Sequence, residues 1–295
     1  MNCNYLFEKK FAEHPNVKKA DESYIRAMSS NVLHTHDGYS RKLANLQQIP
    51  YHERAEYLAK LYLAFEPDFL GLQEVSYEME PILFDLLKDV YDTPHSALGD
   101  AVNYHYHGTD HIQNHTPILY NKHKYEVLDS RFHLFEAGGL WSYEWAVYAL
   151  KSDPTKTIAH MNLHYPSSSA KQYFPAAVDD VHEELVSLRR MYREWIDPAV
   201  RQFRELPIIV TGDYNCRYTS EHFENMVKDL PMTSGMLVAE DGQPDEGIID
   251  HEVVTTDALE VKLHRTLWWR GSDKLSDHPQ TFVDVVLKPQ EIKYE

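Results

Sequence analysis

The chain has 295 residues, 43% of them hydrophobic and 12% aromatic, which excludes a disordered chain and allows one large buried core. Its 29 basic and 46 acidic residues give a formal charge of 29 − 46 = −17, which disfavours a long nucleic-acid duplex and favours a small substrate, although acidity also keeps proteins soluble. Two cysteines are too few for a disulfide framework and no run of 18 apolar residues occurs, so we expect a cytoplasmic protein without a membrane span.

The first part of the chain combines short apolar strands with amphipathic helices. Residues 1–22 are polar and mixed in charge, which is typical of an N-terminal extension or a surface helix. Apolar residues at helical spacing predict a helix over 51–65, which Pro67 ends. The other expected elements are a strand over 24–32, a polar loop over 34–48, a buried strand over 69–72 and a helix over 81–90.

The rest of the chain is predicted to contain mainly strands. A long amphipathic pattern over 178–205 predicts a helix that Pro198 bends or divides, and 220–228 predicts another helix. Because no repeat or linker interrupts the pattern, we expect residues 23–295 to form a single domain of mixed α and β structure. A polar stretch over 91–115 precedes strands over 117–120, 125–130, 144–150, 157–163, 207–211, 249–255, 260–267 and 282–287.

Polar side chains stand at the ends of these apolar strands. Each has an ordinary explanation by itself, since a lone Asp after a strand is commonly a turn residue or a helix cap. The whole set, however, falls at strand ends, where side chains can converge on one crevice while the strands bury their apolar faces. Its members are Asn31, Glu74, His164, Asp213, Asn215, Asp250, Asp277 and His278.

These residue types fit the hydrolysis of a phosphoester, whose negative oxygens resist attack. A hard cation such as Mg²⁺ prefers oxygen ligands, and Asn31, Glu74 and Asp277 supply them. Asp213 is expected to orient or deprotonate the attacking water, and Asn215 to donate its amide hydrogens to a phosphate oxygen. The side chains expected to stabilise the phosphate or protonate the leaving group are His164 and His278, one of them oriented by Asp250.

Six short segments occur in the order known from one superfamily. The segments MSSN, LQE, NLH, GDYN, IDH and SDH resemble the endonuclease/exonuclease/phosphatase superfamily from about residue 24 to about residue 287. That superfamily includes deoxyribonuclease I, abasic-site endonucleases, inositol polyphosphate 5-phosphatases, neutral sphingomyelinases and the deadenylases. GDYN or SDH alone is a weak signal, whereas six segments in order, each in the expected strand context, are specific.

The resemblance implies a fold and a set of roles. The implied fold is a four-layer α/β/β/α sandwich of two mixed sheets, as in deoxyribonuclease I, and the implied cofactor is Mg²⁺ or Mn²⁺. Glu74 is implied as the main metal ligand, with Asn31 and Asp277 nearby. The resemblance also implies that Asp213 activates the nucleophile, that Asn215 holds phosphate, that His164 and His278 contact the scissile phosphate, and that Asp250 pairs with His278.

Two segments narrow the resemblance. HTPILYNKHKYEVLDS and the later EWAVYAL look like an uncharacterised bacterial branch of hydrolases, while ERAEYLAKLYLAFEPDFLGLQEV is similar to that branch and to the deadenylases. Members of the bacterial branch often carry an arginine just before the tryptophan of the strand. This chain has Ser142-Tyr143-Glu144 before Trp145, so the resemblance does not extend to an arginine that grips phosphate there.

Four further features allow more than one interpretation. The loop from Asn103 to His115 contains four histidines, His105 to His115, and we favour substrate recognition over a plain polar loop, with a zinc site as a third alternative. Trp268-Trp269-Arg270 forms either an aromatic lip over the substrate or an edge of the core. Cys216 is expected to be a buried structural thiol, and residues 240–246 to be a solvated acidic loop.

The leading hypothesis is an Mg²⁺- or Mn²⁺-dependent phosphatase or phosphodiesterase that acts on a small phosphorylated molecule. The alternative is an endonuclease or exonuclease on DNA or RNA, although few cations lie near the motifs, namely Arg217, Arg265, Arg270 and Lys274. A non-catalytic scaffold is disfavoured by the complete set of site residues, and a sphingomyelinase-like activity at membranes by the lack of an apolar hairpin. The sequence indicates neither the oligomeric state nor the number of metal ions.

Overall fold

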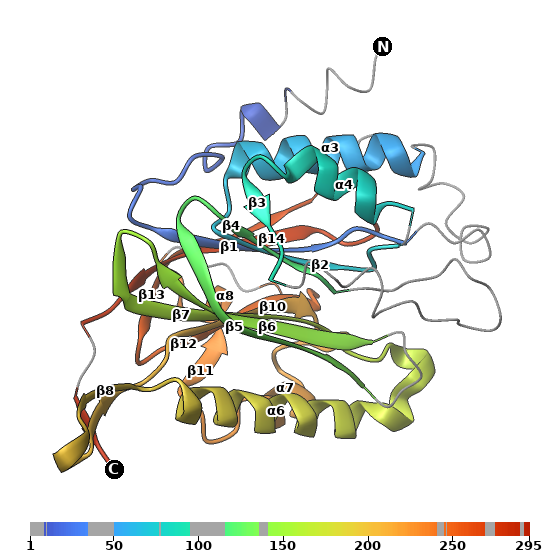
Figure 1. Cartoon of the computed structure of the whole chain (residues 1–295). Helices are drawn as coiled ribbons and strands as arrows, with labels where there is room; N and C mark the ends of the chain where they lie inside the picture. Colours follow the sequence, from blue (N-terminus) through green and yellow to red (C-terminus); the bar gives the residue numbers. More distant parts are fainter. Residues whose placement is uncertain are drawn as a thin grey trace.

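Two mixed β-sheets pack face to face between two layers of helices (Figure 1). The structure is a computed structural model that describes residues 9, 11–34, 50–76, 78–94, 116–135, 141–240, 245, 247–268, 275–289 and 292–295. Helices α3 (Tyr51–Phe65) and α4 (Glu80–Leu87) cover one sheet, and α6 (Phe174–Met191) and α7 (Glu221–Met226) cover the other. This arrangement confirms the predicted four-layer sandwich. Within the described residues, none of the helices is long and apolar enough to cross a membrane.

The first sheet brings the ends of β1 and β2 to one edge. Its strands are β1 (Ile25–Asn31), β2 (Phe69–Gln73), β3 (Tyr91–Asp92), β4 (Ile118–Asn121), β13 (Leu259–Leu267) and β14 (Gln280–Leu287). They are ordered β13-β14-β1-β2-β4-β3, and the central pair β1 and β2 is parallel while all other neighbours are antiparallel. The register aligns Asn31 with Gln73, so Asn31 and Glu74 leave the sheet side by side.

The second sheet also has one parallel pair of strands among antiparallel neighbours. Its strands are β5 (Tyr125–Leu134), β6 (Ser142–Leu150), β7 (Asp153–His164), β10 (Ile208–Asp213), β11 (Met232–Ser234) and β12 (Asp250–Thr255). They are ordered β11-β12-β10-β7-β6-β5, and β7 and β10 are parallel. The register places Asp213 directly between His164 on β7 and Asp250 on β12. Three polar residues that are far apart in the sequence therefore become neighbours across three strands.

The two-residue period of the strands decides which side chains face the interior between the sheets. Val210 of β10 packs under α6, whereas Ile209 joins Ala27 of β1 in the apolar cluster between the two sheets. Asn31 and Asp213 are an even number of residues away from Ala27 and Ile209, so their side chains also point between the sheets. Because both lie at the last position of their strands, they reach the edge of that interior and not its centre.

Helix α3 has the bounds that its apolar spacing predicted. Its buried side includes Leu58 and Phe65 and packs on the outer face of the first sheet. The helix ends where Glu66 adopts a left-handed conformation with φ 49°, just before Pro67. Phe11 is buried in the same cluster, so part of the predicted N-terminal extension packs on this layer.

The predicted helix over 178–205 is wrong at both ends. Helix α6 begins at Phe174 and ends at Met191, and a small sheet follows. Pro198 lacks an N–H, so it cannot continue a helix, and Arg201 adopts a left-handed φ of 56° that turns the chain back. The turn pairs two short strands, to which the end of the chain adds a third. The elements are β8 (Glu194–Asp197), the 3₁₀ turn η2 (Pro198–Val200), β9 (Gln202–Arg204) and β15 (Lys293–Tyr294).

One buried histidine between the sheets makes the stability of the fold depend on pH. His160 of β7 is fully buried against Phe69 and bonds the Thr211 hydroxyl through Nε2 at 2.9 Å. Burial lowers the pKa of His160 from 6.5 to about 3. Below pH 6.5 the unfolded chain therefore binds a proton at His160, whereas the folded chain does not. The contribution of His160 to the free energy of unfolding is fully present above pH 6.5 and is lost as the pH falls toward 3.

We expect His160→Gln to weaken the acid sensitivity of the free energy of unfolding. Between pH 7 and pH 5, the wild type should lose about 2 kcal/mol more than the variant, because glutamine binds no proton in either state. Urea unfolding at the two pH values measures the difference. Equal losses in the two proteins would show that His160 does not titrate on unfolding.

Candidate active site

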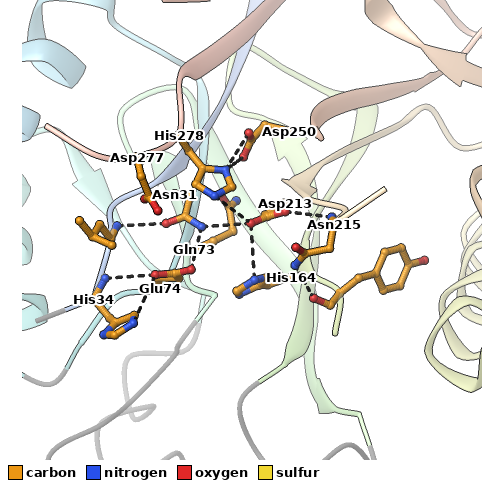
Figure 2. A network of polar contacts seen from close by, with 12 residues as sticks. Asn31, His34, Gln73, Glu74, His164, Asp213, Asn215, Asp250, Asp277 and His278 are labelled. Carbon is orange, nitrogen blue, oxygen red and sulfur yellow. Dashed lines mark hydrogen bonds and ion pairs between the residues drawn. The ribbon is translucent and has the colours of Figure 1, made fainter. Parts of the chain in front are cut away.

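The polar strand ends of the two sheets meet at one edge of the sandwich (Figure 2). Asn31 and Glu74 come from the first sheet, His164 and Asp213 from the parallel pair of the second, and Asp250 from the neighbouring β12. Asn31, Asp213 and Asp250 are almost completely buried. Parallel strands end at the same edge of a sheet, so this convergence follows from the topology.

Asn31 joins the two sheets at the site. Its amide nitrogen donates to Glu74 Oε1 and to Asp213 Oδ2, both at 3.1 Å, and its oxygen accepts the Leu33 N–H at 3.0 Å. Leu33 and Glu74 adopt left-handed φ values of 58° and 59°, which are costly for residues with side chains. Both turns carry the chain around the edge of the sheet, with the Glu74 carboxylate directed at Asn31.

Several histidines keep Glu74 ionised. Burial alone raises the pKa of a carboxyl group, but the positive charges of His164, His34 and His278 and the hydrogen bond from Asn31 outweigh it and lower the pKa of Glu74. The backbone N–H of His34 donates to Glu74 Oε2 at 3.2 Å. Glu74 is therefore an anionic oxygen donor at neutral pH.

Asp213 lies at the centre of the group. Its Oδ2 lies 3.5 Å from His164 Nε2 and 3.7 Å from His278 Nε2, while its Oδ1 accepts the backbone N–H of Asn215 at 2.9 Å. Asn215 takes a left-handed φ of 47°, which asparagine tolerates better than most residues. Its side-chain amide donates to the Tyr165 carbonyl at 2.8 Å, so Asn215 stands at the rim of the site.

The buried Asp250 and the partly exposed His278 form an acid–imidazole pair. His278 Nδ1 lies 2.9 Å and 3.1 Å from the two Asp250 oxygens, which leaves Nε2 directed at Asp213. Burial lowers the pKa of His278, but the charges of Asp250 and Asp213 outweigh it and raise this pKa well above its usual value. The imidazole is therefore protonated at neutral pH, with its second N–H facing the centre of the site.

A second row of polar side chains fixes the site from behind. Gln73 donates to Asn162 Oδ1 at 2.7 Å, and Asn162 in turn donates to the Leu72 carbonyl at 2.6 Å and accepts from the Thr211 hydroxyl at 3.0 Å. Gly71 leaves the room for this contact, because a Cβ there would lie 2.0 Å from Thr211 Oγ1 and 2.3 Å from Asn162 Oδ1. The two sheets are thus held together by amides directly behind the catalytic candidates.

The structure brings together seven of the eight predicted site residues through the contacts described above. The eighth, Asp277, lies next to His278 on the Asn31 side of the site in Figure 2, and its negative charge acts on both His278 and Arg54. His34 was expected only as part of a polar loop, yet its ring lies 3.9 Å from Glu74. Its only sequence signal is its position three residues after Asn31.

The contacts of Tyr143 and Glu144, the two residues before Trp145, lie outside the group of site residues. Glu144 is fully buried on the inner face of β6, where its carboxylate accepts the Ile118 N–H at 3.4 Å. Tyr143 and Trp145 point the other way and donate to Glu184 of α6, at 3.3 Å and 2.7 Å. The departure from the bacterial pattern thus falls on interior and helix-facing positions.

The other sequence features are only partly covered by the described residues. Cys216 is buried and burial raises its pKa to about 11, which fits the expected structural thiol. Trp268 is half exposed at 51%, whereas Trp269 and Arg270 lie outside the described residues. The loop from His105 to His115, Lys274 and most of the acidic stretch 240–246 also lie outside them.

The residues present fit a divalent cation. Glu74, His164 and Asp213 offer ligand atoms within 4.8 Å of one another, and so do Asp213, Asp250 and His278. Carboxylate and amide oxygens are the ligands that Mg²⁺ and Mn²⁺ prefer. Three carboxylates in one place, the buried Asp213 and Asp250 and the partly buried Glu74, repel each other, and a cation relieves this repulsion.

Comparisons with known proteins agree with the observed fold. A model of the endonuclease/exonuclease/phosphatase family matches residues 28–278. A comparison with curated proteins found no match. Among solved structures, a mannosyl-6-phosphatase from Bacteroides thetaiotaomicron is 17% identical, with a TM-score of 0.68 over 89% of this chain and 99% of that one.

Two eukaryotic structures share the fold as well. The human Nocturnin catalytic domain with a bound sulfate anion is 18% identical, with a TM-score of 0.67 over 91% of this chain and 95% of that one. TDP2 from D. rerio, in complex with a single-strand DNA product, is 16% identical, with a TM-score of 0.59 over 90% of this chain and 99% of that one. At these identities the likeness establishes the fold alone.

Proposed function

The chain belongs to the endonuclease/exonuclease/phosphatase family, and we propose that it hydrolyses the phosphoester of a small phosphorylated molecule with the help of Mg²⁺ or Mn²⁺. The observation that carries the proposal is the contact of Asp213 with Asn31, His164 and His278 at the meeting point of the two sheets. We further propose that residues 23–295 form one catalytic domain and that the protein is cytoplasmic.

The metal is proposed to lie at the acidic side of the site. Glu74 is the main ligand in this proposal, with Asn31 and Asp277 nearby. A bound divalent cation supplies positive charge that offsets the negative charge of the phosphate. Glu74 suits this role because it is anionic at neutral pH and its carboxylate is fixed by Asn31 and by the His34 N–H.

Asp213 is proposed to orient the attacking water and to accept its proton. Its Oδ1 is held by the Asn215 N–H, so Oδ2 is the atom available for the water. Asn31 also donates to Oδ2 and fixes its direction. A positioned carboxylate of this kind contributes about 10²- to 10⁴-fold in rate.

The two histidines are proposed to stabilise the phosphate as its charge develops. His278 presents the N–H of Nε2 toward the centre of the site, because Nδ1 is engaged by Asp250. His164 approaches Asp213 from the adjacent strand with its Nε2. Asn215, at the rim, is proposed to turn its amide from the Tyr165 carbonyl to a phosphate oxygen.

A small substrate agrees with the charge of −17 and with the mannosyl-6-phosphatase among the structural neighbours. A nuclease is the second candidate, because TDP2 carries a single-strand DNA product in the same fold. A long nucleic acid needs a basic surface, since its affinity rests largely on neutralised phosphates. Of the four cations close to the motifs in the sequence, Arg217 and Arg265 lie within the described residues, and this small number favours the small substrate.

We expect purified protein to hydrolyse at least one member of a panel of sugar phosphates, nucleotides and phosphodiesters in the presence of Mg²⁺ or Mn²⁺. Removing the metal with EDTA should abolish the release of product, and adding the metal back should restore it. Labelled single- and double-stranded DNA and RNA at low salt test the nuclease alternative in parallel. No release from any substrate with either metal, together with no loss in Asp213→Ala, would refute the proposed function.

A further inference from the structure

Arg54 of α3 is a buried arginine that binds backbone carbonyls. It is 2% exposed, and its guanidinium donates to the carbonyls of Val32 at 2.7 Å, Leu33 at 2.9 Å and Leu275 at 3.2 Å. Its Nε has no hydrogen-bond partner among the described residues. Burying a cation costs free energy. The stability of helix α3 therefore does not by itself explain why a charged side chain is buried here against three carbonyls.

The three carbonyls belong to two separate segments that both carry site residues. Val32 and Leu33 lie between Asn31 and His34, on the turn that leaves β1. Leu275 lies two residues before Asp277 and three before His278, on the segment that enters β14. These segments lie 22 and 221 residues from Arg54 in the sequence, and the guanidinium spans the gap between them.

The positive charge of Arg54 interacts with Asp277 and Glu74 at the acidic side of the site. Burial lowers the pKa of Arg54 to about 10, whereas the negative charges of Asp277 and Glu74 raise it, so the side chain remains protonated at neutral pH. Asp277 and Glu74 are the proposed metal ligands. The guanidinium thus stands behind the acidic side of the site and not within it, because its hydrogen bonds go to the backbone.

The other buried arginines of the described chain are used differently. Arg26 of β1 forms a bidentate pair with Asp284, at 2.7 Å and 2.8 Å, and also donates to the carbonyls of Val17 and Phe65, at 2.9 Å and 2.8 Å. Arg189 of α6 binds Asp257 at 2.7 Å and Glu205 at 3.5 Å. Both neutralise carboxylates far from the site. In contrast, the hydrogen bonds of Arg54 go to the main chain on both sides of the proposed ligands.

We propose that Arg54 is a positioning residue that fixes the spacing between the turn after β1 and the segment before β14, so that Asn31, Glu74 and Asp277 form one ligand set. The effect of Arg54 on catalysis rests on the proposed function. Its structural part, the clamping of two segments, stands without that function. A planar guanidinium has five N–H donors in fixed directions, so it can bind three carbonyls at once. The ammonium group of a lysine cannot reproduce this geometry.

The test compares Arg54→Met and Arg54→Lys with Arg189→Met. The control removes an equally buried arginine from the opposite helical layer, and Asp257 keeps a partner in Lys293 at 2.9 Å. Amide hydrogen exchange over residues 31–34 and 275–279 reports the clamp directly. Calorimetry with Mn²⁺ alone measures the affinity of the proposed ligand set, and kcat and KM are recorded with the best substrate of the panel.

In Arg54→Met we expect faster exchange in both segments and an Mn²⁺ dissociation constant weaker by roughly 10- to 100-fold, as for other residues that orient metal ligands. Arg54→Lys should fall between this variant and the wild type, since it keeps the charge but loses carbonyl bonds. In Arg189→Met, exchange in both segments and the Mn²⁺ dissociation constant should match the wild type, even if the protein unfolds at a lower temperature.

A folded Arg54→Met with wild-type exchange in either segment, or an Mn²⁺ affinity within twofold of the wild type, would overturn the proposal. If Arg54→Met does not fold, Arg54→Lys decides by the same two measurements. If the wild type itself neither binds Mn²⁺ nor hydrolyses any substrate, the proposed function fails. The exchange data then still decide whether Arg54 clamps the two segments.

Discussion

Replacing Asp213 by asparagine is expected to lower kcat by about 10³-fold, with KM changed far less. The amide keeps the oxygen that accepts the Asn215 N–H, but it loses the charge that faces His164 and His278. It can no longer accept a proton from water at neutral pH. Initial rates with the best substrate of the panel, at saturating Mg²⁺ or Mn²⁺, measure the loss.

The folded state of this variant must be shown to survive. Asp213 stands near two other carboxylates, Glu74 and Asp250, so removing its charge also relieves repulsion. We therefore expect circular dichroism to match the wild type and the unfolding temperature to change little. A well-folded Asp213→Asn that keeps more than a tenth of wild-type kcat would show that another group activates the water.

The second large effect is expected at Asp250. Asp250→Asn should lower kcat by about 10²- to 10³-fold, because His278 loses the carboxylate that fixes its ring and holds its proton. The pKa of His278 should fall toward its ordinary value, which NMR titration of the imidazole measures. The rate at neutral pH should fall with it, since a neutral ring presents a weaker donor to phosphate.

Strand β12 supplies a matched control for this change. Glu252 lies two residues further along the same strand and pairs with His264 at 3.1 Å, while Thr281 donates to its other oxygen at 2.5 Å. This second acid–imidazole pair is buried between the sheets, and Glu252 acts on Asp250 only through its charge, which raises the pKa of Asp250. Glu252→Gln should reduce the free energy of unfolding by about 1–3 kcal/mol and leave kcat within about threefold.

The two variants separate a role in the site from a role in the fold. If Glu252→Gln loses as much kcat as Asp250→Asn, the effect comes from disturbing β12 and not from His278. If Asp250→Asn retains kcat within threefold of the wild type, the proposed role of the Asp250–His278 pair is wrong.

Helix α6 shows where sequence patterns reach their limit. Apolar spacing predicts helical structure well where one face is continuously buried, as in α3 and in the body of α6. Trp195 and Phe203 extended that pattern by chance, yet their rings meet edge to face in a separate small sheet, with ring centroids 5.7 Å apart. The pairing of β8 with β9 across the η2 turn, and of β9 with β15, depends on contacts between strands that the apolar period of one segment cannot reveal.

Some residues of the site could be predicted from the sequence, and others could not. The predicted set from Asn31 to His278 was accessible because each member stands at or beside one end of an apolar strand, and chemistry then restricts which residue types are useful there. His34 and Arg54 were missed because neither stands at the end of a strand: His34 comes three residues after Asn31, and Arg54 lies within helix α3. Their roles depend on backbone groups brought close by packing, namely the turn after β1 and the Leu275 carbonyl.

By itself the sequence determined the residue types at the strand ends, the alternation that turns them between the sheets, and the resemblance that the family model confirms. Only the tertiary structure decided which of those residues touch. Parallel pairing of β7 with β10 and antiparallel pairing of β10 with β12 set Asp213 between His164 and Asp250. Packing of the two sheets then brought Asn31 to Asp213. The sequence alone does not reveal these contacts, because strand register and sheet packing depend on residues far apart in the chain.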